Sequence, residues 1–560
     1  MEKTVTDRAS QVVPKETPDA ASESRTVLPK ASTVVFLTIA LCLGVFCMSL
    51  VRKLDKASET PVITKLTPPS PQDVTIIATA IPRIADQFNS LDDVGWYGSS
   101  YLLTNCATTL AFGKFYTYYS TKWVYLSALC LFEIGSAVCG ATPNSLGLIL
   151  GRCLAGLGAG GLFSGSLLII AQVVPLHRRP VFTALLGSMF GIASVIGPPL
   201  GGAFTDHISW RWCFYINLPI GAVTGLFVLF FFHAPGPVQS RPSLRHLLRK
   251  LDPIGTVLFL PAIVCLLLAL QWGGNKYTWD NWRIIVLFVV AGVLLLAFGG
   301  CQVWQGDDAT LPPRIVRNRD IWSSAWFALT LNGAYFVFIY YLPIWFQSIK
   351  SASATKSGLM SLPSILAVVI VSILSGVTVM VFGYYNPFMI LASAILAVGA
   401  GLLSTLEPDS DPGLWISYQI LAGIGVGLGQ QLPFVVVQNV LPDSDVPTGT
   451  AVVTFAQTLG GAIFISVAQS VFTNQFRRVM WAADPSISVA EILAAGTTTL
   501  RQKLQGDQLT TVVHSYNSAV TQAFYVGVAL AALSVFGTLA LEWRSVKKTE
   551  KPAPVEANAS

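Results

Sequence analysis

Long apolar runs dominate this chain and set what it can fold into. Fourteen stretches of roughly 20 residues, the length that crosses a hydrocarbon core, are almost free of charged side chains. The first six lie near 34–50, 96–117, 124–141, 147–171, 180–204 and 212–233. A pair follows near 254–272 and 284–303, and the last six lie near 322–346, 358–382, 386–406, 413–438, 448–472 and 522–541. Because a helix satisfies its own backbone hydrogen bonds in lipid, these runs predict an all-α polytopic membrane protein with 14 transmembrane helices in a 6+2+6 arrangement.

Charged residues are scarce for a chain of this length. They make up 11% of the 560 residues, against about 25% in soluble domains, and hydrophobic residues make up 53%. The nine cysteines show no CxxC or other metal-ligand spacing. The glycine pattern at 156–161 lies inside an apolar run with no strand before it, which argues against a dinucleotide site. We therefore expect a membrane protein that is not an enzyme and that holds no metal and no cofactor.

Basic residues in the loops indicate the orientation of the chain, because positively charged short loops stay on the cytoplasmic side. The loops after the fourth, sixth and eighth runs contain Arg178, Arg179, Arg241, Arg245, Arg249, Lys250, Arg314, Arg317 and Arg319. The acidic loop with Glu407, Asp409 and Asp411 falls on the opposite side. Both termini are therefore predicted to face the cytoplasm. The net charge of +6 reflects this topology rather than a surface for nucleic acid.

Polar segments divide the chain into parts. The first 33 residues contain no short apolar core before a small-residue cleavage site, so they predict a disordered cytoplasmic tail and no signal peptide. The C-terminal stretch after Arg544 is expected to be disordered as well. The predicted parts are the tail 1–33, an N-terminal six-helix bundle 34–233, a linker with two inserted helices 234–320, a C-terminal six-helix bundle 321–541 and a cytoplasmic tail 542–560.

An internal repeat links the two groups of six runs. Residues 152–180 align without gaps with residues 419–447, at a constant offset of 267. Gly156 and Gly158, for example, recur as Gly423 and Gly425. The matching runs are separated by an even number of crossings, so the halves have the same orientation, as in parallel repeats around a central cavity. The repeat breaks at its first residue, where Arg152 is matched by Gln419.

A run of glycine and proline without charge, GSMFGIASVIGPPLGG, occupies residues 187–202. Glycines on one helix face let two backbones approach closely in lipid, and a Pro-Pro pair lets a covered helix bend. The residues of this run that we single out are Gly187, Gly191, Gly197, Pro198, Gly201 and Gly202.

These segments resemble motifs of the major facilitator superfamily, in its fourteen-span drug:proton antiporter branch. RCLAGLGAGG at 152–161 is similar to the fourth-span Arg-Gly motif, and the run at 187–202 is similar to the fifth-span antiporter motif. WRWCFYINLPIG at 210–221 resembles the entry to span six, and DVTIIATAIP at 73–82 resembles the first-span acidic motif. The resemblance covers roughly residues 34–541 and implies the major facilitator fold and a proton-coupled efflux pump of the fungal toxin and multidrug type.

The chain departs from the family pattern at two places. The loop at 113–126, GKFYTYYSTKWVYL, lacks the acidic and paired basic residues of the general loop motif. Residues 51–72, VRKLDKASETPVITKLTPPSPQ, form an unusual polar insert between the first apolar run and Asp73. Without the insert, residues 34–50 and 73–82 would join into one span with Asp73 inside it. Codons for its terminal Val and Gln can provide intron edges, so we hypothesise that 51–72 is a retained intron that has been translated.

Three ionisable residues of the apolar segments are the proton-coupling candidates: Asp73, Glu133 and Arg152. A charged side chain inside a span costs at least ~2.5 kcal/mol on insertion scales, so it faces the protein interior or a water-filled cavity. Burial disfavours the charged form of a carboxyl group, which suits a group that loads and releases a proton. The architectural alternatives are that Arg152 clamps carbonyl groups of a neighbouring helix and that Glu133 pairs with Arg152 or with a hydroxyl group.

Aromatic and carboxamide side chains within the runs are the candidates for contact with a small molecule. Aromatic walls with few polar groups suit promiscuous apolar ligands. The alternatives are that the rings face lipid or the membrane interface, and that the amides bond between helices. The candidates are Asn105, Trp326, Asn332, Tyr335, Tyr340, Gln347, Gln430, Gln431 and Gln457.

The resemblance implies export of a small lipophilic organic molecule across the plasma membrane in exchange for protons. A secondary metabolite or toxin is the expected cargo, with drug efflux as the near alternative. The expected partners are the lipid bilayer, the small molecule and protons, and the chain is expected to be a monomer. Two other classes remain open: a vacuolar transporter of basic amino acids, and a membrane sensor that binds a ligand without moving it.

Overall fold

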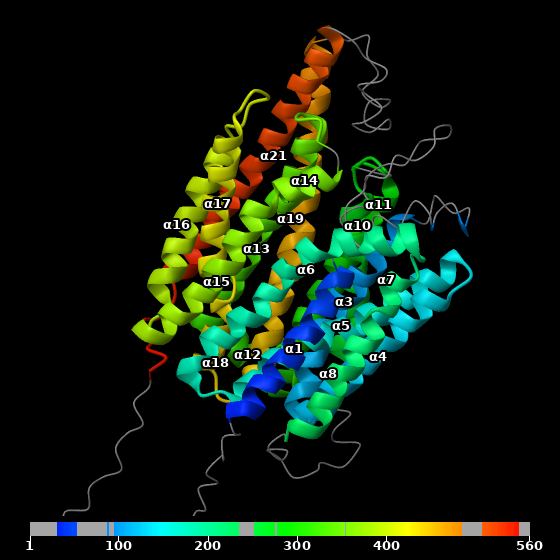
Figure 1. Ribbon diagram of the computed structural model, residues 1–560. Coiled ribbons are helices and arrows are strands. Elements are labelled where there is room, and N and C mark those ends of the chain that lie inside the picture. Colours follow the sequence, from blue (N-terminus) through cyan, green and yellow to red (C-terminus); the bar gives the residue numbers. More distant parts are fainter. Residues whose placement is uncertain are drawn as a thin grey trace, which may run out of the picture.

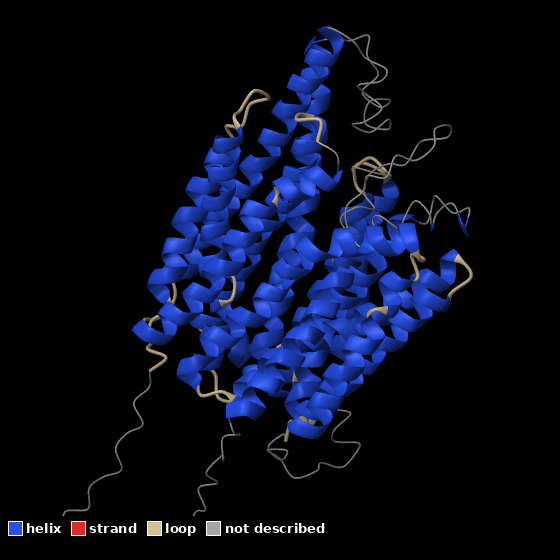
Figure 2. Ribbon diagram, in the orientation of Figure 1, coloured by secondary structure: helices blue, strands red, loops and turns tan. Residues whose placement is uncertain are grey.

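The computed structural model describes residues 31–52, 84, 87–88, 94–233, 251–274, 277–352, 354–483 and 507–547. Most of these residues form long helices that run side by side (Figure 1). The named elements of the described chain are all helices (Figure 2). Three predicted features lie outside the described residues: the tail at 1–30, the segment 53–83 with Asp73 and most of the polar insert, and the basic loop at 234–250.

The N-terminal half consists of seven named α-helices in the described residues, and from α3 onward short loops join them. They are α1 (Ala31–Arg52), α3 (Val94–Tyr118), α4 (Thr121–Ala141), α5 (Ser145–Val173), α6 (Arg179–His207), α7 (Trp212–Tyr215) and α8 (Asn217–Phe231). Local signals fix several of their ends. The Asn144 side chain caps α5 by accepting a hydrogen bond from the Gly147 N–H at 2.8 Å. Pro180 lies in the first turn of α6, where its missing N–H is tolerated.

The linker and the C-terminal half are also helical. The linker contains α10 (Pro253–Trp272), α11 (Trp282–Gln305) and α12 (Pro313–Val316). The C-terminal half contains α13 (Arg319–Ser348), α14 (Ala354–Met360), α15 (Leu362–Phe382), α16 (Asn386–Leu403), α17 (Pro412–Gly429), α18 (Leu432–Val440), α19 (Val446–Ala483) and α21 (Asp507–Leu539). The Asn318 side chain caps α13 by accepting a hydrogen bond from the Asp320 N–H at 3.0 Å.

Thirteen helices of the described chain are long and apolar enough to cross a membrane. α3 is not among them, although it has 25 residues and packs along α5 and α19. Hydroxyl and amide side chains such as Thr104, Asn105 and Thr108 make α3 less apolar than its neighbours. The prediction of an all-α polytopic membrane fold is confirmed, and the number of fourteen spans stays a prediction.

The internal repeat reappears in the helix packing. α5 packs against α3 and α4, and the repeated helix α17 packs against α15 and α16. A Cβ atom on Gly158 would lie 2.5 Å from the backbone N of Phe132 in α4. A Cβ atom on the equivalent Gly425 would lie 2.5 Å from the backbone N of Leu396 in α16. The repeated glycines therefore allow the same close helix contact in each half.

Each half has its own hydrophobic core, and the most extensive contacts between the halves are along two helix pairs. One buried cluster contains most of the core side chains of α1 to α8, and a second contains those of α13 to α21. Between the halves, α6 packs against α15 and α3 packs against α19. A Cβ on Gly376 of α15 would lie 2.7 Å from the Pro180 carbonyl O, and a Cβ on Gly113 of α3 would lie 2.7 Å from the Ala451 Cβ. Both close contacts lie at the end of the bundle that holds the α3–α4 and α18–α19 turns, which we call the closed end.

Helix boundaries differ from the predicted runs where packing rather than hydropathy sets them. The run 413–438 divides into α17 and α18 at Gln430 and Gln431. α19 continues to Ala483 and α21 begins at Asp507, beyond the apolar limits at 472 and 522. Polar contacts between these two helices support the extensions, since the Gln475 Nε2 donates a hydrogen bond to the Ser518 Oγ at 3.1 Å.

The predicted disorder of the tails is wrong at their inner ends. Residues 31–33 already belong to α1. Residues 545–547 pack against the turn after α15, because the Val546 N–H donates a hydrogen bond to the Gly383 carbonyl O at 2.8 Å and the Val546 side chain is buried. The lysines in this stretch indicated a disordered tail, and the sequence shows neither the apolar contact nor the backbone contact.

Candidate functional site

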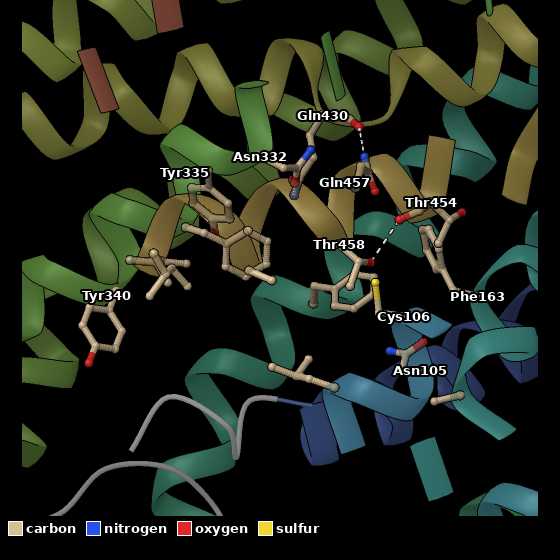
Figure 3. Close-up of a pocket in the computed structure, with 18 of the residues that line it drawn as sticks. Asn105, Cys106, Phe163, Asn332, Tyr335, Tyr340, Gln430, Thr454, Gln457 and Thr458 are labelled. Carbon is tan, nitrogen blue, oxygen red and sulfur yellow. Dashed lines mark hydrogen bonds between the residues drawn. The ribbon is translucent and has the colours of Figure 1, made fainter. Parts of the chain in front are cut away.

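A cavity of about 190 Å³ lies between the two halves. Its walls come from α1, α3, α5 and α6 of the N-terminal half, from α13, α15, α19 and the α17–α18 junction of the C-terminal half, and from α10. The sequence candidates that line it are Asn105, Asn332, Tyr335, Tyr340, Gln430, Gln431 and Gln457. The structure thus brings side chains from distant parts of the chain around one space (Figure 3).

Carboxamide side chains meet on the C-terminal wall of the cavity. The Gln430 Nε2 donates a hydrogen bond to the Asn332 Oδ1 at 3.3 Å, and the Gln457 Nε2 donates to the Gln430 carbonyl O at 3.0 Å. The Asn332 Nδ2 donates in turn to the Ala328 carbonyl O at 3.1 Å. Asn105 lies across the cavity from this group (Figure 3). Neutral polar groups therefore face the cavity from both halves.

The glycine run contributes to the cavity at its start. Gly187 and Gly191 line the space, and α6 runs through the whole of 187–202 as one helix. A Cβ atom on Gly187 would meet the Gln431 side chain, and one on Gly191 would meet the Val369 Cγ2. Both glycines therefore make room for side chains of the C-terminal half. The other residues singled out in this run lie along the same helix: Gly197, Pro198, Gly201 and Gly202.

Aromatic rings form much of the remaining wall. Phe163 of α5 and Phe190 of α6 pack edge to face, with ring centroids 5.3 Å apart. Phe163 also contacts Phe434 of α18, with centroids 5.6 Å apart, so this ring bridges the halves. On the other side, Tyr335 and Tyr340 of α13 border the space (Figure 3). Such walls accept flat apolar molecules.

Two predicted contacts lie outside the cavity lining. The Trp326 indole Nε1 donates a hydrogen bond to the Leu533 carbonyl O at 2.9 Å, and its ring stacks on Trp322. The Gln347 Nε2 lies 3.5 Å from the Ser357 Oγ, near the far end of α13. Both residues belong to the helix that provides Asn332 and Tyr335. Trp326 lies on another face of α13, whereas Gln347 lies two turns beyond Tyr340, past the end of the cavity.

Arg152 joins two helices of the N-terminal half. Its side chain is 1% exposed. The Nε donates a hydrogen bond to the Tyr97 carbonyl O at 2.6 Å, and the guanidinium carbon lies 4.6 Å from the centre of the Tyr101 ring. These contacts tie α5 to α3 and agree with the clamp that the sequence left as an alternative. Arg152 is not among the residues that line the cavity.

Glu133 lies in α4 and faces α8. Both carboxylate oxygens are buried, and no described residue donates a hydrogen bond to them. The carboxylate lies where a side chain on Gly221 would be, so this glycine makes room for the acid. The pairing of Glu133 with Arg152 that the sequence left open is therefore not formed. Glu133 also lies outside the cavity lining, and its part in proton coupling stays a prediction, as does that of Asp73.

An ion pair fastens the linker to the C-terminal half at the closed end. The two terminal guanidinium nitrogens of Arg314 donate to the Asp445 carboxylate at 2.6 and 2.9 Å, and the Arg314 Nε lies 3.0 Å from the Asp307 Oδ1. The hydrogen bonds to Asp445 raise the pKa of Arg314 above its ordinary value. In the sequence, Arg314 stands out only as a basic loop residue that indicates topology.

A second polar cluster surrounds Asp252, which precedes α10. Its carboxylate accepts hydrogen bonds from the Gly255 N–H at 2.6 Å, from Gln302 at 2.8 Å, from Gln305 at 2.7 Å and from the backbone and hydroxyl of Thr310 at 2.9 Å each. Burial alone would raise the pKa of this carboxyl group, but the hydrogen bonds outweigh burial and hold the pKa below its ordinary value. One acid thus joins α10, α11 and the loop before α12.

Several residues of the cavity wall are missing from the sequence candidates. Most are large apolar side chains, which look like any core residue, or hydroxyl groups, which are common in spans, and one is the amide Gln271 at the end of its apolar run. A signal did exist for Thr454 and Thr458, since two polar residues four positions apart share one helix face. The missed lining residues include Phe163, Phe190, Gln271, Phe336, Thr454, Thr458 and Ser466.

The described part of the chain offers no group of three His, Cys, Asp or Glu residues that could hold a metal ion. Its cysteines are unpaired with one another. The cavity itself is lined by neutral hydrogen-bonding groups, aromatic rings and aliphatic side chains.

Two helical halves that enclose a central cavity, with apolar helices of membrane length, define a polytopic membrane protein of the solute-carrying type. The chain belongs to the Major Facilitator Superfamily, whose family description matches residues 70–465. The match covers most of both halves and the inserted pair.

Several fungal proteins are similar to this chain over its full length or nearly so. "Efflux pump roqT" of Penicillium rubens is 70% identical over 100% of both chains. "MFS-type transporter astH" of Aspergillus oryzae is 55% identical over 94% of this chain and 90% of its own. "Efflux pump aunC" of Aspergillus niger is 54% identical over 92% and 94% of the two chains.

Solved structures share the fold at low sequence identity. The human organic anion transporter MFSD10 (TETRAN) aligns with a TM-score of 0.56 at 13% identity, over 90% of this chain and 100% of its own. The proton:xylose symporter XylE aligns with a TM-score of 0.52 at 13% identity, over 90% and 95% of the two chains. These likenesses confirm the major facilitator fold that the sequence predicts.

Proposed function

We propose that this protein exports a small lipophilic organic molecule from the cell in exchange for protons. The observation that carries the proposal is the central cavity, whose walls come from both halves and combine aromatic rings with neutral amides. Relatives of similar length are named efflux pumps, which supports the same direction of transport. The cargo is a secondary metabolite or toxin, and drug resistance follows if the cavity accepts unrelated apolar compounds.

Transport of this kind requires that the cavity open to one side at a time. The close contacts of Gly113 and Gly376 lie at one end of the bundle, and so does the ion pair between Arg314 and Asp445. The cavity lies on the other side of these contacts, toward the end that holds the α16–α17 turn. This arrangement is that of one state of an alternating-access cycle, in which the two halves rock around the binding site.

The closed end is the cytoplasmic end in this proposal. The turns there contain Arg178, Arg179, Arg314 and Arg317, whereas the opposite α16–α17 turn contains acidic residues. Positively charged loops stay in the cytoplasm, so both termini are cytoplasmic and the cavity of this state faces outward. The membrane is the plasma membrane.

Protons supply the free energy for export. One charge that moves through 100 mV yields ~2.3 kcal/mol, which supports nearly two decades of concentration before any pH gradient is added. Glu133 and Asp73 are the proton carriers in this proposal, and Arg152 holds the α3–α5 pair in place. Glu133 lies outside the cavity lining, so a proton on Glu133 is held within the N-terminal half while the cargo binds between the halves.

The test uses the full-length protein in liposomes with an acidic lumen and a pH-sensitive dye trapped inside. 1-Pyrenemethanol, a flat neutral fluorophore, is added outside. Exchange of the probe for protons makes the lumen lose its acidity faster than in protein-free liposomes, and a protonophore abolishes the difference. Binding of the probe without accelerated proton movement would identify a sensor and refute the proposal.

A further inference from the structure

We propose that the cavity selects neutral, flat molecules with an N–H or O–H group, and that Gln431, seated against Gly187, accepts the hydrogen bond from that group. This inference rests on the proposed function, because it names the class of cargo for the same cavity. It adds a residue that decides specificity and a physical reason for the glycine that begins the run at 187–202.

Gln431 has a buried side-chain oxygen that no described residue satisfies. The side chain lines the cavity and is 6% exposed. Its Oε1 is buried, and no described residue donates a hydrogen bond to it. A buried acceptor without a donor is costly, so a donor brought by a bound molecule is favoured at this position.

The neighbouring amides use their N–H groups within the protein. The Nε2 groups of Gln430 and Gln457 and the Nδ2 of Asn332 all donate to protein oxygens at 3.0 to 3.3 Å. Those three residues are therefore bonded to the protein through their N–H groups, whereas Gln431 has, of the described residues that line the cavity, the side-chain oxygen that is fully buried and receives no hydrogen bond. Its position at the break between α17 and α18 places it next to Phe434, which packs on Phe163.

Gly187 explains how the side chain fits. A Cβ atom at this position would overlap the Cδ and Nε2 of Gln431. The overlap involves the flexible end of a side chain, not the backbone, so a Cβ would displace the amide and leave the helices in place. Gly187 of the N-terminal half thus positions the amide of the C-terminal half.

The rest of the lining favours a neutral, flat partner. Of the described residues that border the cavity, none is Asp, Glu, Lys, Arg or His. A charged ligand would lose its hydration there without gaining a counter-charge. Phe163 and Phe190 on one side and Tyr335 and Phe336 on the other provide the apolar surfaces that a planar ring system can contact.

Four probes on one ring system test the inference by equilibrium binding to the full-length protein in lipid nanodiscs, with no pH gradient. They are 1-pyrenemethanol, its methyl ether, 1-pyrenemethylamine as the ammonium ion, and 1-pyrenecarboxylate. The alcohol is expected to bind about tenfold more tightly than the ether, which lacks the donor, and both ions are expected to bind at least about tenfold more weakly than the alcohol.

Variants assign the effect to Gln431. Gln431→Leu is expected to bind the alcohol and the ether equally. Gln431→Glu keeps an acceptor and adds negative charge, so the ammonium probe should gain affinity relative to the carboxylate. As a single change, Gly187→Ala should reduce the preference for the alcohol over the ether. Added to Gln431→Leu, it should have no further effect on that preference, because the two changes act on one contact. Gln347→Leu, outside the cavity lining, is the matched control.

The inference is overturned if the ammonium ion or the carboxylate binds as tightly as the alcohol, if the alcohol has no advantage over the ether, or if Gln431→Leu keeps that advantage. Failure of all four probes to bind also overturns it. The four-probe comparison on the parent protein needs no variant, so a poorly folded variant does not remove the test. Proton movement in liposomes tests the proposed function separately, so failure of the specificity inference can be distinguished from failure of the transport proposal.

Discussion

Replacement of Gly376 by Ala should weaken the closed end. A Cβ atom there would lie 2.7 Å from the Pro180 carbonyl O and 3.0 Å from the Val181 Cα. These are backbone atoms of α6, so they cannot rotate aside, and the helices must separate. Overpacking of this kind costs about 1–3 kcal/mol. A cost near 2 kcal/mol that falls only on the closed state would raise the population of the open state roughly 30-fold.

The assay measures how often the closed end opens. Thr448 is buried in the contact between α3 and α19, and its Oγ1 lies 3.4 Å from the Thr117 Oγ1. A Thr448→Cys variant reacts with a maleimide only when this contact opens, and mass spectrometry of the peptide that contains residue 448 gives the rate. Gly376→Ala is expected to increase that rate by roughly 30-fold.

Gly401→Ala serves as the control, because a Cβ at Gly401 has no neighbour within 4 Å. It should leave the labelling rate unchanged. Equal rates in the parent protein and in Gly376→Ala would show that the α6–α15 contact does not hold this end closed, and the reasoning would be refuted.

Three further predictions concern polar groups. Asp252→Asn should lower the free energy of unfolding by about 1.5–3 kcal/mol, because hydrogen bonds to a charged acceptor weaken. The folded-state pKa of Asp252 lies below its ordinary value, so its stabilisation is present above ~3.9 and is lost as the pH falls through the lowered pKa. Thermal unfolding at pH 7 and pH 3 should therefore differ less in the variant than in the parent. A double-mutant cycle on Arg314 and Asp445 should give a coupling of about 0.2–1 kcal/mol in the same assay, because the arginine side chain is 53% exposed; a coupling above ~2 kcal/mol would contradict this. Glu133→Gln should leave binding of 1-pyrenemethanol unchanged and reduce the proton movement it drives by at least about tenfold, and unaltered proton movement would remove Glu133 from the coupling role.

The membrane fold and much of the cavity could be predicted from the sequence, because both follow from the cost of polar groups in lipid. Asn332, Gln430 and Gln457 stand out as amides within apolar runs, and the structure joins them by hydrogen bonds. Burial without a partner is so unfavourable that such residues must face one another or a cavity. The sequence pattern alone therefore singles out residues that line the cavity.

Contacts between segments far apart in the chain could not be predicted from the sequence pattern. The fit of Gln431 against Gly187 depends on how the two halves dock, which no local pattern records. Trp326 and Asn332 lie on one helix, yet only the second borders the cavity, because the rotation of α13 decides which face each residue occupies. The hydrogen bond from Gln302 of α11 to Asp252, which precedes α10, likewise joins two segments about 50 residues apart.

The central claim is that cargo crosses the membrane only when the two ends of the cavity open in turn. The direct measurement uses a Thr117→Cys, Thr448→Cys double variant, whose hydroxyl oxygens in the parent are 3.4 Å apart across the closed end. With this pair joined as a disulfide, proton movement driven by 1-pyrenemethanol in liposomes should stop and should return on reduction. A joined protein that moves protons at the full rate would contradict the account.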